Sequence, residues 1–160
     1  MTGAHTTNGI PHGSTSLTPH LVVSPARAAI DFYVSAFGAR LLDLTTFPDG
    51  DAVAHAVLDF GSGMLTLSDP IESYGLAAPQ QGAPSSFSLA VYVPQVDRAT
   101  EAAVAAGATL REPPATFVTG DRFASILDPY GVRWSIMTRV EDLSFEESAR
   151  RVAEWAATQG

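Results

Sequence analysis

Cysteine and lysine are both missing from this chain of 160 residues, because all nine basic residues are arginine. Without cysteine there can be no disulfide, no thiolate nucleophile and no zinc or iron–sulfur site built on thiolates. Without lysine there can be no Schiff-base chemistry through a lysine amine. Any chemistry must therefore come from histidine, carboxylate, hydroxyl, arginine and aromatic side chains.

Long apolar runs and an excess of positive charge are also missing. No apolar segment approaches the roughly 20 residues that a membrane helix needs. The first 16 residues, MTGAHTTNGIPHGSTS, have neither the basic start nor the apolar stretch of a signal peptide. The formal net charge of −8 argues against nucleic acid as a partner. We expect a globular cytoplasmic protein with no membrane or nucleic-acid partner.

What the sequence does contain is one unit written twice. Each copy has a β-rich run, a proline, a helical pattern and then Gly-Ala, as in residues 21–42 and 90–110. The matching segments are 69 residues apart in three places: Gly38-Ala39 with Gly107-Ala108, Leu58-Asp59 with Leu127-Asp128, and 65–67 with 134–136. A constant offset across separate segments predicts two modules of order β-α-β-β-β.

The modules predict the division of the chain. Residues 1–16 are expected to be a flexible lead-in, and residues 17–140 a single domain with module one at 17–69 and module two at 86–140. A linker rich in Pro, Gly and Ala falls at 70–85. A C-terminal helix is expected within 141–160, where Ser144 and Glu147 form a capping box. We expect its apolar stripe to pack on the body of the protein or on a partner subunit: Phe145, Ala149, Val152 and Ala156, with Trp155 beside it.

Alternation along the predicted strands separates an apolar face from a mixed one. The apolar face, which includes Trp134, should pack under the helices. The mixed face carries too little charge for a fully solvated surface and is typical of the wall of a ligand cup. Its candidate ligand-binding residues are His20, Thr66, Ser88, Tyr92, Arg133, Ser135 and Met137, with His55 added from a strand of ambiguous phase.

Several of these residues also have structural interpretations. His20 could be satisfied by a neighbouring backbone group, and Arg133 could form an ion pair with a surface carboxylate. Tyr92 and Met137 could belong to the core. Phe47, Phe117 and Phe123 fall in or beside loops, where aromatic side chains can cover a pocket, and Asp128 is expected to be a turn residue.

The segments TPHLVVSPARAAIDFYVSAFGARLL and GDRFASILDPYGVRWSIMTRVEDLS resemble the vicinal oxygen chelate superfamily. The resemblance covers residues 17–148 and is closest to glyoxalase/bleomycin-resistance-like proteins of the PhnB-like kind. It implies an α+β fold in which two βαβββ modules form an incomplete barrel, followed here by the C-terminal helix. It also implies a homodimer whose cups hold either a metal with substrate or a sequestered small molecule.

The resemblance places the metal-ligand positions of the superfamily near Thr18, with His20 two residues on, and at Thr66, Ser88 and Ser135. A neutral hydroxyl is a poor ligand for Fe, Ni, Zn or Mn, which prefer imidazole and carboxylate. We therefore expect neither a metal nor another cofactor.

The favoured hypothesis is a metal-free protein that sequesters an aromatic or cationic compound such as an antibiotic. One alternative is a metal-dependent lyase, isomerase or dioxygenase in which His20 and His55 converge with a loop carboxylate: Asp49, Asp51 or Glu72. Another is a metal-free enzyme in which His20 acts as a general base, with Ser88 and Ser135 donating to an oxyanion.

Overall fold

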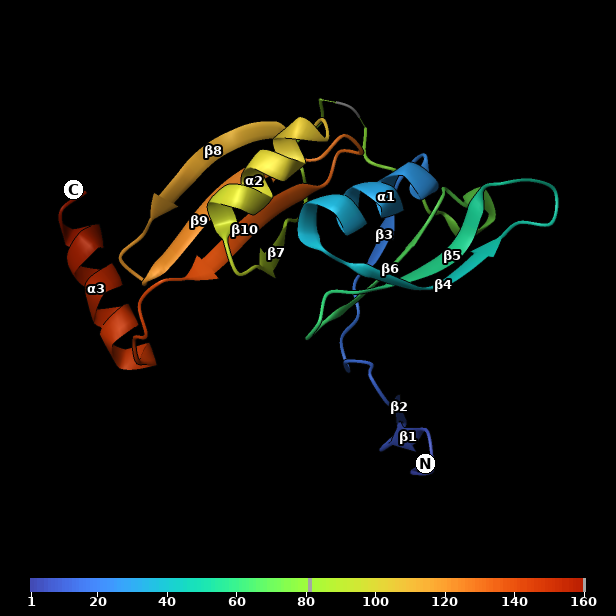
Figure 1. Ribbon diagram of the computed structural model, residues 1–160, viewed down its shortest axis with the longest axis horizontal. Coiled ribbons are helices and arrows are strands. Elements are labelled where there is room, and N and C mark those ends of the chain that lie inside the picture. The colour runs from blue at the N-terminus through green and yellow to red at the C-terminus, as the bar shows by residue number, and fades with distance from the viewer. Residues whose placement is uncertain (81, 160) are drawn as a thin grey trace. The chain divides into compact units, whose positions relative to one another are not determined.

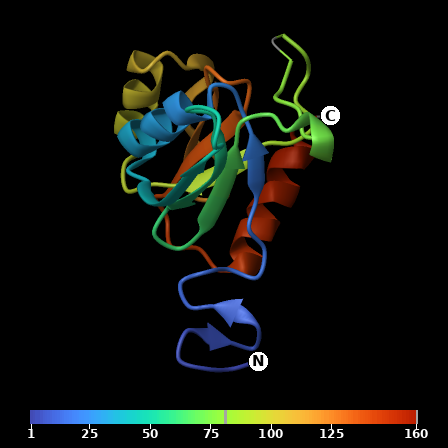
Figure 2. The same ribbon diagram turned by 90° about the vertical axis from the view of Figure 1, so that its right-hand side faces the viewer.

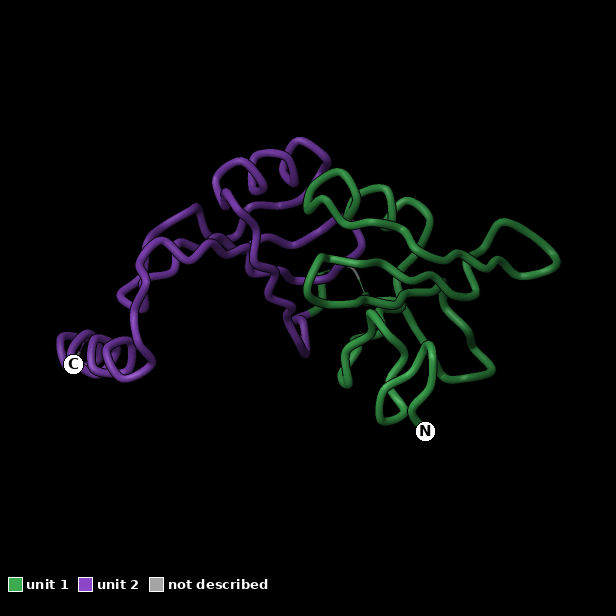
Figure 3. The backbone as a smooth tube through the Cα atoms, turned by 60° about the horizontal axis from the view of Figure 1, so that its bottom comes forward, with its two compact units in different colours: residues 1–83 green, residues 84–160 purple. Residues whose placement is uncertain are grey.

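The structure, a computed structural model, describes residues 1–80 and 82–159. These residues form two compact units, Met1–Ala83 and Pro84–Gly160, coloured separately in Figure 3. Each unit carries one four-stranded sheet with a helix on one face. This architecture confirms the α+β fold class of two βαβββ modules with a C-terminal helix.

Unit 1 contains the first sheet, in the strand order β3-β6-β5-β4 (Figure 1). β3 runs parallel to β6, and the other neighbouring pairs are antiparallel. The elements are β3 (His20–Val22), α1 (Ala26–Phe37), β4 (Arg40–Thr46), β5 (Val53–Asp59) and β6 (Met64–Ser68), followed by the short 3-10 helix η1 (Glu72–Tyr74).

Unit 2 repeats this plan in the order β7-β10-β9-β8, with β7 parallel to β10. Its elements are β7 (Leu89–Tyr92), α2 (Val96–Ala105), β8 (Thr109–Thr116), β9 (Asp121–Leu127), β10 (Arg133–Arg139) and α3 (Phe145–Ala157). Strands β3, β4 and β6 begin at residues 20, 40 and 64, and β7, β8 and β10 begin at 89, 109 and 133. Each difference is 69, so the sequence repeat corresponds to a structural repeat.

The repeat extends to the anchoring of the two main helices. At the start of α1, Asp69 accepts a hydrogen bond from the backbone N–H of Ala26 at 3.0 Å. At the start of α2, Thr138 accepts one from the N–H of Val96 at 2.9 Å. Asp69 and Thr138 are also 69 residues apart, so one position in the repeat satisfies an otherwise unpaired donor at each helix start.

Helix α1 ends at a glycine in the left-handed backbone conformation, as the sequence predicts. Gly38 is the C-cap with φ 71°, a conformation that glycine adopts without steric cost. The end of α2 differs slightly, because its C-cap is Ala106 and the left-handed Gly107 follows with φ 103°.

The core of each unit lies between the helix and the apolar face of the sheet. In unit 2 it includes Trp134, which is 3% exposed, as the alternation predicts. The Trp134 indole N–H donates to Asp128 Oδ2 at 3.0 Å, and Asp128 Oδ1 also accepts from two backbone N–H groups of the turn. Asp128 is therefore a turn residue, as expected, and it also links the turn to the core.

Residues 1–16, for which the composition suggested a flexible lead-in, contain a small antiparallel hairpin of β1 (Thr6–Thr7) and β2 (Ile10–Pro11). Asn8 and Gly9, both with positive φ, form its turn. The hairpin projects away from the four-stranded sheet of unit 1 (Figure 2).

The C-terminal helix α3 begins at the predicted cap. The Ser144 hydroxyl accepts from the backbone N–H of Glu147 at 3.1 Å. The second half of the predicted capping box is absent, because the Glu147 carboxylate accepts hydrogen bonds from Arg150 and Arg151 instead. These hydrogen bonds lower the pKa of Glu147 to about 2.

The apolar stripe of α3 is not covered within unit 2. None of the described residues of α3 is buried, and Phe145 is 87% exposed. The helix is held near its C-terminal end by an edge-to-face contact between Trp155 and Phe117, whose ring centroids are 5.0 Å apart. Unit 2 therefore does not cover the Phe145 end of the stripe, and packing on a partner subunit stays a prediction. Over the described residues, no helix is long and apolar enough to cross a membrane.

The two turn aspartates offer a matched test of the repeat. Asp128→Ala should lower the free energy of unfolding by about 2–3 kcal/mol, because it leaves buried donors, including the Trp134 indole, without their acceptor. Asp59→Ala, at the equivalent and more exposed position, should lower the free energy of unfolding clearly less, because solvent screens its interactions with Arg40 and Gly61. Denaturant unfolding followed by tryptophan fluorescence measures both, and equal losses would contradict this view of the turn.

Candidate functional site

The candidate site of unit 1 lies on the face of its sheet opposite α1. Strand pairing places His20 beside Thr66 and Thr66 beside Val57, and directly paired residues point to the same face. The neighbouring residues Leu65 and Leu67 are buried on the helix side. His20, Thr66, Ser68 and His55 therefore share the open face, and the structure resolves the phase of the strand that contains His55.

The His20 imidazole is hydrogen-bonded on both nitrogens by side chains of β6. Its Nδ1 lies 2.9 Å from Thr66 Oγ1, and its Nε2 lies 3.3 Å from Ser68 Oγ. Thr66 also donates to the carbonyl oxygen of Pro19 at 3.2 Å. The alternative interpretation was a hydrogen bond from His20 to a backbone group. The structure shows such a link only through the Thr66 hydroxyl, which bonds to both His20 and the Pro19 carbonyl.

The environment favours an uncharged His20. Burial lowers the pKa of His20 below its ordinary value of 6.5, and repulsion from His55 lowers it further. The two imidazole rings lie with centroids 6.3 Å apart and planes within 6° of parallel. The His20 ring is therefore neutral at neutral pH.

Ser68 is the site residue that sequence analysis missed as a candidate. Its side chain is fully buried, although it belongs to the open face. The available signal was its position two residues after Thr66, which placed it on the same mixed face. Its contact with the His20 ring at 3.3 Å is not revealed by strand alternation alone.

The open face of unit 2 is built around Arg133, Ser135 and Met137 on β10. Ser135 is paired with Ala90 on β7 and with Ser125 on β9, and Met137 is paired with Tyr92. Ser88 is exposed and directly precedes β7. Five of the predicted ligand-binding residues therefore belong to unit 2: Ser88, Tyr92, Arg133, Ser135 and Met137. The other three, His20, His55 and Thr66, belong to unit 1.

Arg133 forms the surface ion pair that was considered as its structural alternative. Its Nη2 lies 2.8 Å from Glu112, and its Nε donates to Ser125 at 3.2 Å. Tyr92 is 57% exposed, so it is not a core residue. Its hydroxyl donates to Asp121 at 3.3 Å, and Asp121 also pairs with Arg139 at 3.0 Å.

The loop aromatics behave differently from one another. Phe117 packs against Trp155 on α3. Phe123 is paired with Met137 and lies on the open face of unit 2. Phe47 follows β4 and is half-buried.

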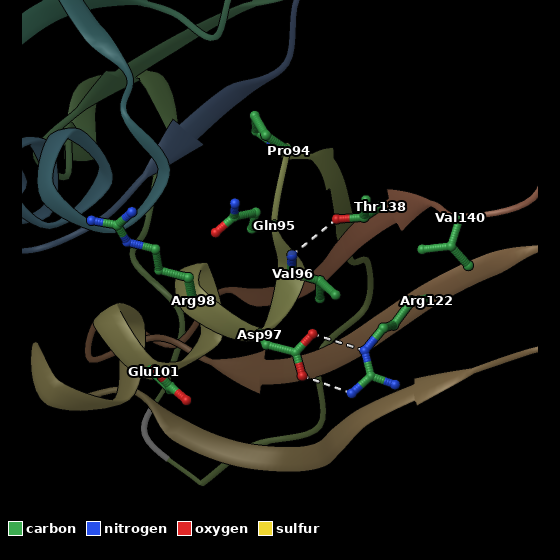
Figure 4. Close-up of a pocket in the computed structure, with 9 residues that line it drawn as sticks. All are labelled: Pro94, Gln95, Val96, Asp97, Arg98, Glu101, Arg122, Thr138 and Val140. Atoms are coloured by element: carbon green, nitrogen blue, oxygen red, sulfur yellow. Dashed lines mark hydrogen bonds and ion pairs between the residues drawn. The ribbon is translucent and has the colours of Figure 1, made fainter.

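A separate cavity of about 580 Å³ opens beside the start of α2 (Figure 4). It was not expected from the sequence. Across it, Arg122 donates two hydrogen bonds to Asp97, at 2.6 and 2.8 Å, which lower the pKa of Asp97. The hydroxyl of Thr138, which lines the cavity, accepts from the backbone N–H of Val96 and donates to the carbonyl oxygen of Val93. These polar groups serve the fold, so the cavity is a weaker candidate than the two open faces.

The donor set does not fit a divalent metal. In the part of the chain that the structure describes, no three His, Cys, Asp or Glu side chains gather in a way that could hold a metal ion. Unit 1 brings two imidazoles together, but both nitrogens of His20 already contact hydroxyls. First-row metals in proteins usually have three or more imidazole, carboxylate or thiolate ligands.

Comparison with known proteins supports the resemblance seen in the sequence. Residues 9–136 match the family model described as "Glyoxalase/Bleomycin resistance protein/Dioxygenase superfamily". An uncharacterized protein from Mycobacterium bovis is 33% identical over 137 residues, which is 82% of this chain and 88% of the relative.

Solved structures share the fold. TioX from Micromonospora sp. ML1 superposes with a TM-score of 0.60 at 25% identity, over 81% of this chain and all of TioX. A glyoxalase I variant from Zea mays superposes with a TM-score of 0.60 at 23% identity, over 76% of this chain and 46% of that one. The second likeness shows the fold alone.

Metal loading tests the fit of the donor set. After dialysis against Fe(II), Ni(II), Zn(II) or Mn(II) and removal of free metal, we expect well under one ion per chain by elemental analysis. A variant with His5 and His12 changed to alanine controls for binding at the N-terminal hairpin. Stoichiometric metal that persists in this control and disappears in His20→Ala would contradict the expectation.

Proposed function

Because this chain belongs to the Glyoxalase/Bleomycin resistance protein/Dioxygenase superfamily, we propose that it is a metal-free, cytoplasmic small-molecule-binding protein. Its ligand is an aromatic or cationic compound such as an antibiotic, which it sequesters without converting it. The open faces of the two sheets provide the binding surfaces, and the protein acts as a homodimer.

The observation that carries this proposal is the state of His20. Its two nitrogens are hydrogen-bonded to the hydroxyl groups of Thr66 and Ser68, which lie on the same sheet. A metal ligand needs a free nitrogen lone pair, and a general base needs one aimed at the substrate. His20 has neither while these bonds are formed, so it is better suited to contact a ligand than to change it.

The surroundings support a ligand that is aromatic or cationic. The unit 1 face presents two stacked imidazole rings, of which His20 is neutral at neutral pH, and the unit 2 face presents Tyr92 and Phe123. The net charge of −8 favours the approach of cations.

The metal-free enzyme has one observation in its favour, because Ser68 and His20 form a Ser–His contact of the kind that activates nucleophiles. However, Ser68 is completely buried and offers its oxygen to no substrate. Among the alternatives considered, the metal-dependent enzyme has weaker support, because neither Asp49, Asp51 nor Glu72 joins the two histidines in a metal-binding group of described residues.

The homodimer is proposed from α3. Its stripe has apolar positions at residues 145, 149, 152 and 156, and this 4-3-4 spacing is that of a seam between two packed helices. The opposite side of the helix is occupied by ion pairs of Arg150 and Arg151 with Glu147 and Glu154. A second copy related by a two-fold axis offers the same apolar stripe, which matches it in length and chemistry.

Ligand capture tests sequestration. The protein is incubated with a panel of aromatic and cationic antibiotics, and the compounds that co-elute with it are identified by mass spectrometry. We expect at least one to be recovered at its unaltered mass and to bind about 2- to 10-fold more weakly to His20→Ala, because an aromatic contact is lost. His5→Ala, in the N-terminal hairpin, should bind normally. Recovery of only altered compounds would contradict sequestration.

Light scattering tests the dimer. The full chain should have the mass of a dimer at tens of micromolar, and truncation after Asp142 should shift it towards the monomer because the apolar stripe is lost. Phe145→Ser should weaken the dimer without removing the helix, whose cap at Ser144 is unchanged. A monomeric full chain with α3 intact would contradict the assignment of the stripe to a second copy.

A further inference from the structure

The hydrogen bonds around His20 run in one direction. A carbonyl oxygen can only accept, so Thr66 uses its single hydroxyl proton when it bonds to Pro19, whose oxygen also accepts from the Thr66 backbone N–H. The Thr66 oxygen is then left to accept from His20. With the Thr66–Pro19 bond formed, Nδ1 of His20 is the donor to Thr66 and carries a proton.

The other ring nitrogen is fixed by Ser68. In a neutral imidazole with a proton on Nδ1, Nε2 is an acceptor, and the Ser68 hydroxyl donates to it. Ser68 is fully buried, and the described residues give its hydroxyl no other hydrogen-bond partner. If Nε2 became protonated, the Ser68 proton would need a new acceptor in a buried place, which is costly.

We propose that Thr66 and Ser68 are positioning residues that hold His20 as the neutral tautomer protonated on Nδ1, so that the ring meets an aromatic group of the ligand with its face. This inference rests on the proposed binding function and specifies the chemistry of that site. With both nitrogens occupied, the ring offers its π-face and its C–H edges rather than a hydrogen bond. Aromatic rings stack on such a surface with no change in its protonation.

Burial and the neighbouring His55 favour a neutral His20 ring, whereas carboxylates farther along the face oppose it. His55 on β5 is the group that opposes its protonation, and β6 contributes the uncharged Thr66 and Ser68. Farther along the same face, the strand register adds Asp43 on β4 and Asp59 on β5, and Asp59 is paired with Arg40. Because the pKa of His20 is lowered, the neutral ring persists at neutral pH and is lost only as the pH falls below 6.5.

Nitrogen-15 spectroscopy of the histidine rings in the ligand-free protein tests the tautomer directly. We expect the wild-type spectrum of His20 to show the Nδ1–H pattern at neutral pH. Thr66→Val, which keeps the shape of the side chain, removes the acceptor and should shift His20 towards the Nε2–H pattern, with Ser68 now accepting.

The pKa of His20 should change differently in two variants. Ser68→Ala removes a hydrogen bond to the neutral ring and should raise the pKa of His20. Thr66→Val removes an acceptor that a charged ring would bind more strongly, and should not raise it. A general loosening of the fold would raise the pKa in both variants. An Nε2–H pattern in the wild type, or a rise in both variants, would overturn the proposal, and the wild-type spectrum does so even if a variant fails to fold.

A titration with indole tests the contact through the ring face. Indole should move the carbon-bound ring protons of His20 upfield through its ring current, whereas cyclohexanol, a non-aromatic control, should not. No shift with indole, or equal shifts with both, would show that the ring face is not the contact. Because the tautomer is measured without ligand, failure of the proposed binding function leaves that result unchanged, and the two ideas can fail separately.

Discussion

The parallel pairing of β3 with β6 is the constraint on which the unit 1 site depends. It sets His20 beside Thr66 and brings Ser68 within reach of the same ring. The equivalent pairing of β7 with β10 sets Ala90 beside Ser135, so unit 2 has the same frame without an imidazole. One backbone arrangement therefore supports two chemically different faces, one with a pair of imidazole rings and the other with arginine and tyrosine.

The fold could be predicted because local and long-range signals agreed. The offset of 69 residues recurs in strand starts and in the residues that anchor the helices, and the alternation of Trp134 and Ile136 placed the core correctly. The same alternation placed His20 and Thr66 on the open face. These features follow from periodicity, which a sequence displays directly.

The parts that could not be predicted depend on side chains that meet across strands or on surfaces with no visible partner. The pairing of Arg133 with Glu112 requires the irregular register between β8 and β9. The contact of Ser68 with His20 joins side chains of two different strands. The hairpin at residues 6–11 depends on its turn in a segment whose composition suggests flexibility. The stripe of α3 had a clear period, but the period does not say what covers it.

The central claim is that these faces hold an intact small molecule without a metal. Native mass spectrometry of the protein isolated gently from its own cells tests this most directly, combined with analysis of whatever is released on denaturation. The account predicts an added mass that corresponds to an intact aromatic or cationic organic compound, with no metal. Stoichiometric Fe, Ni, Zn or Mn in the isolated protein, dependent on His20, would contradict it.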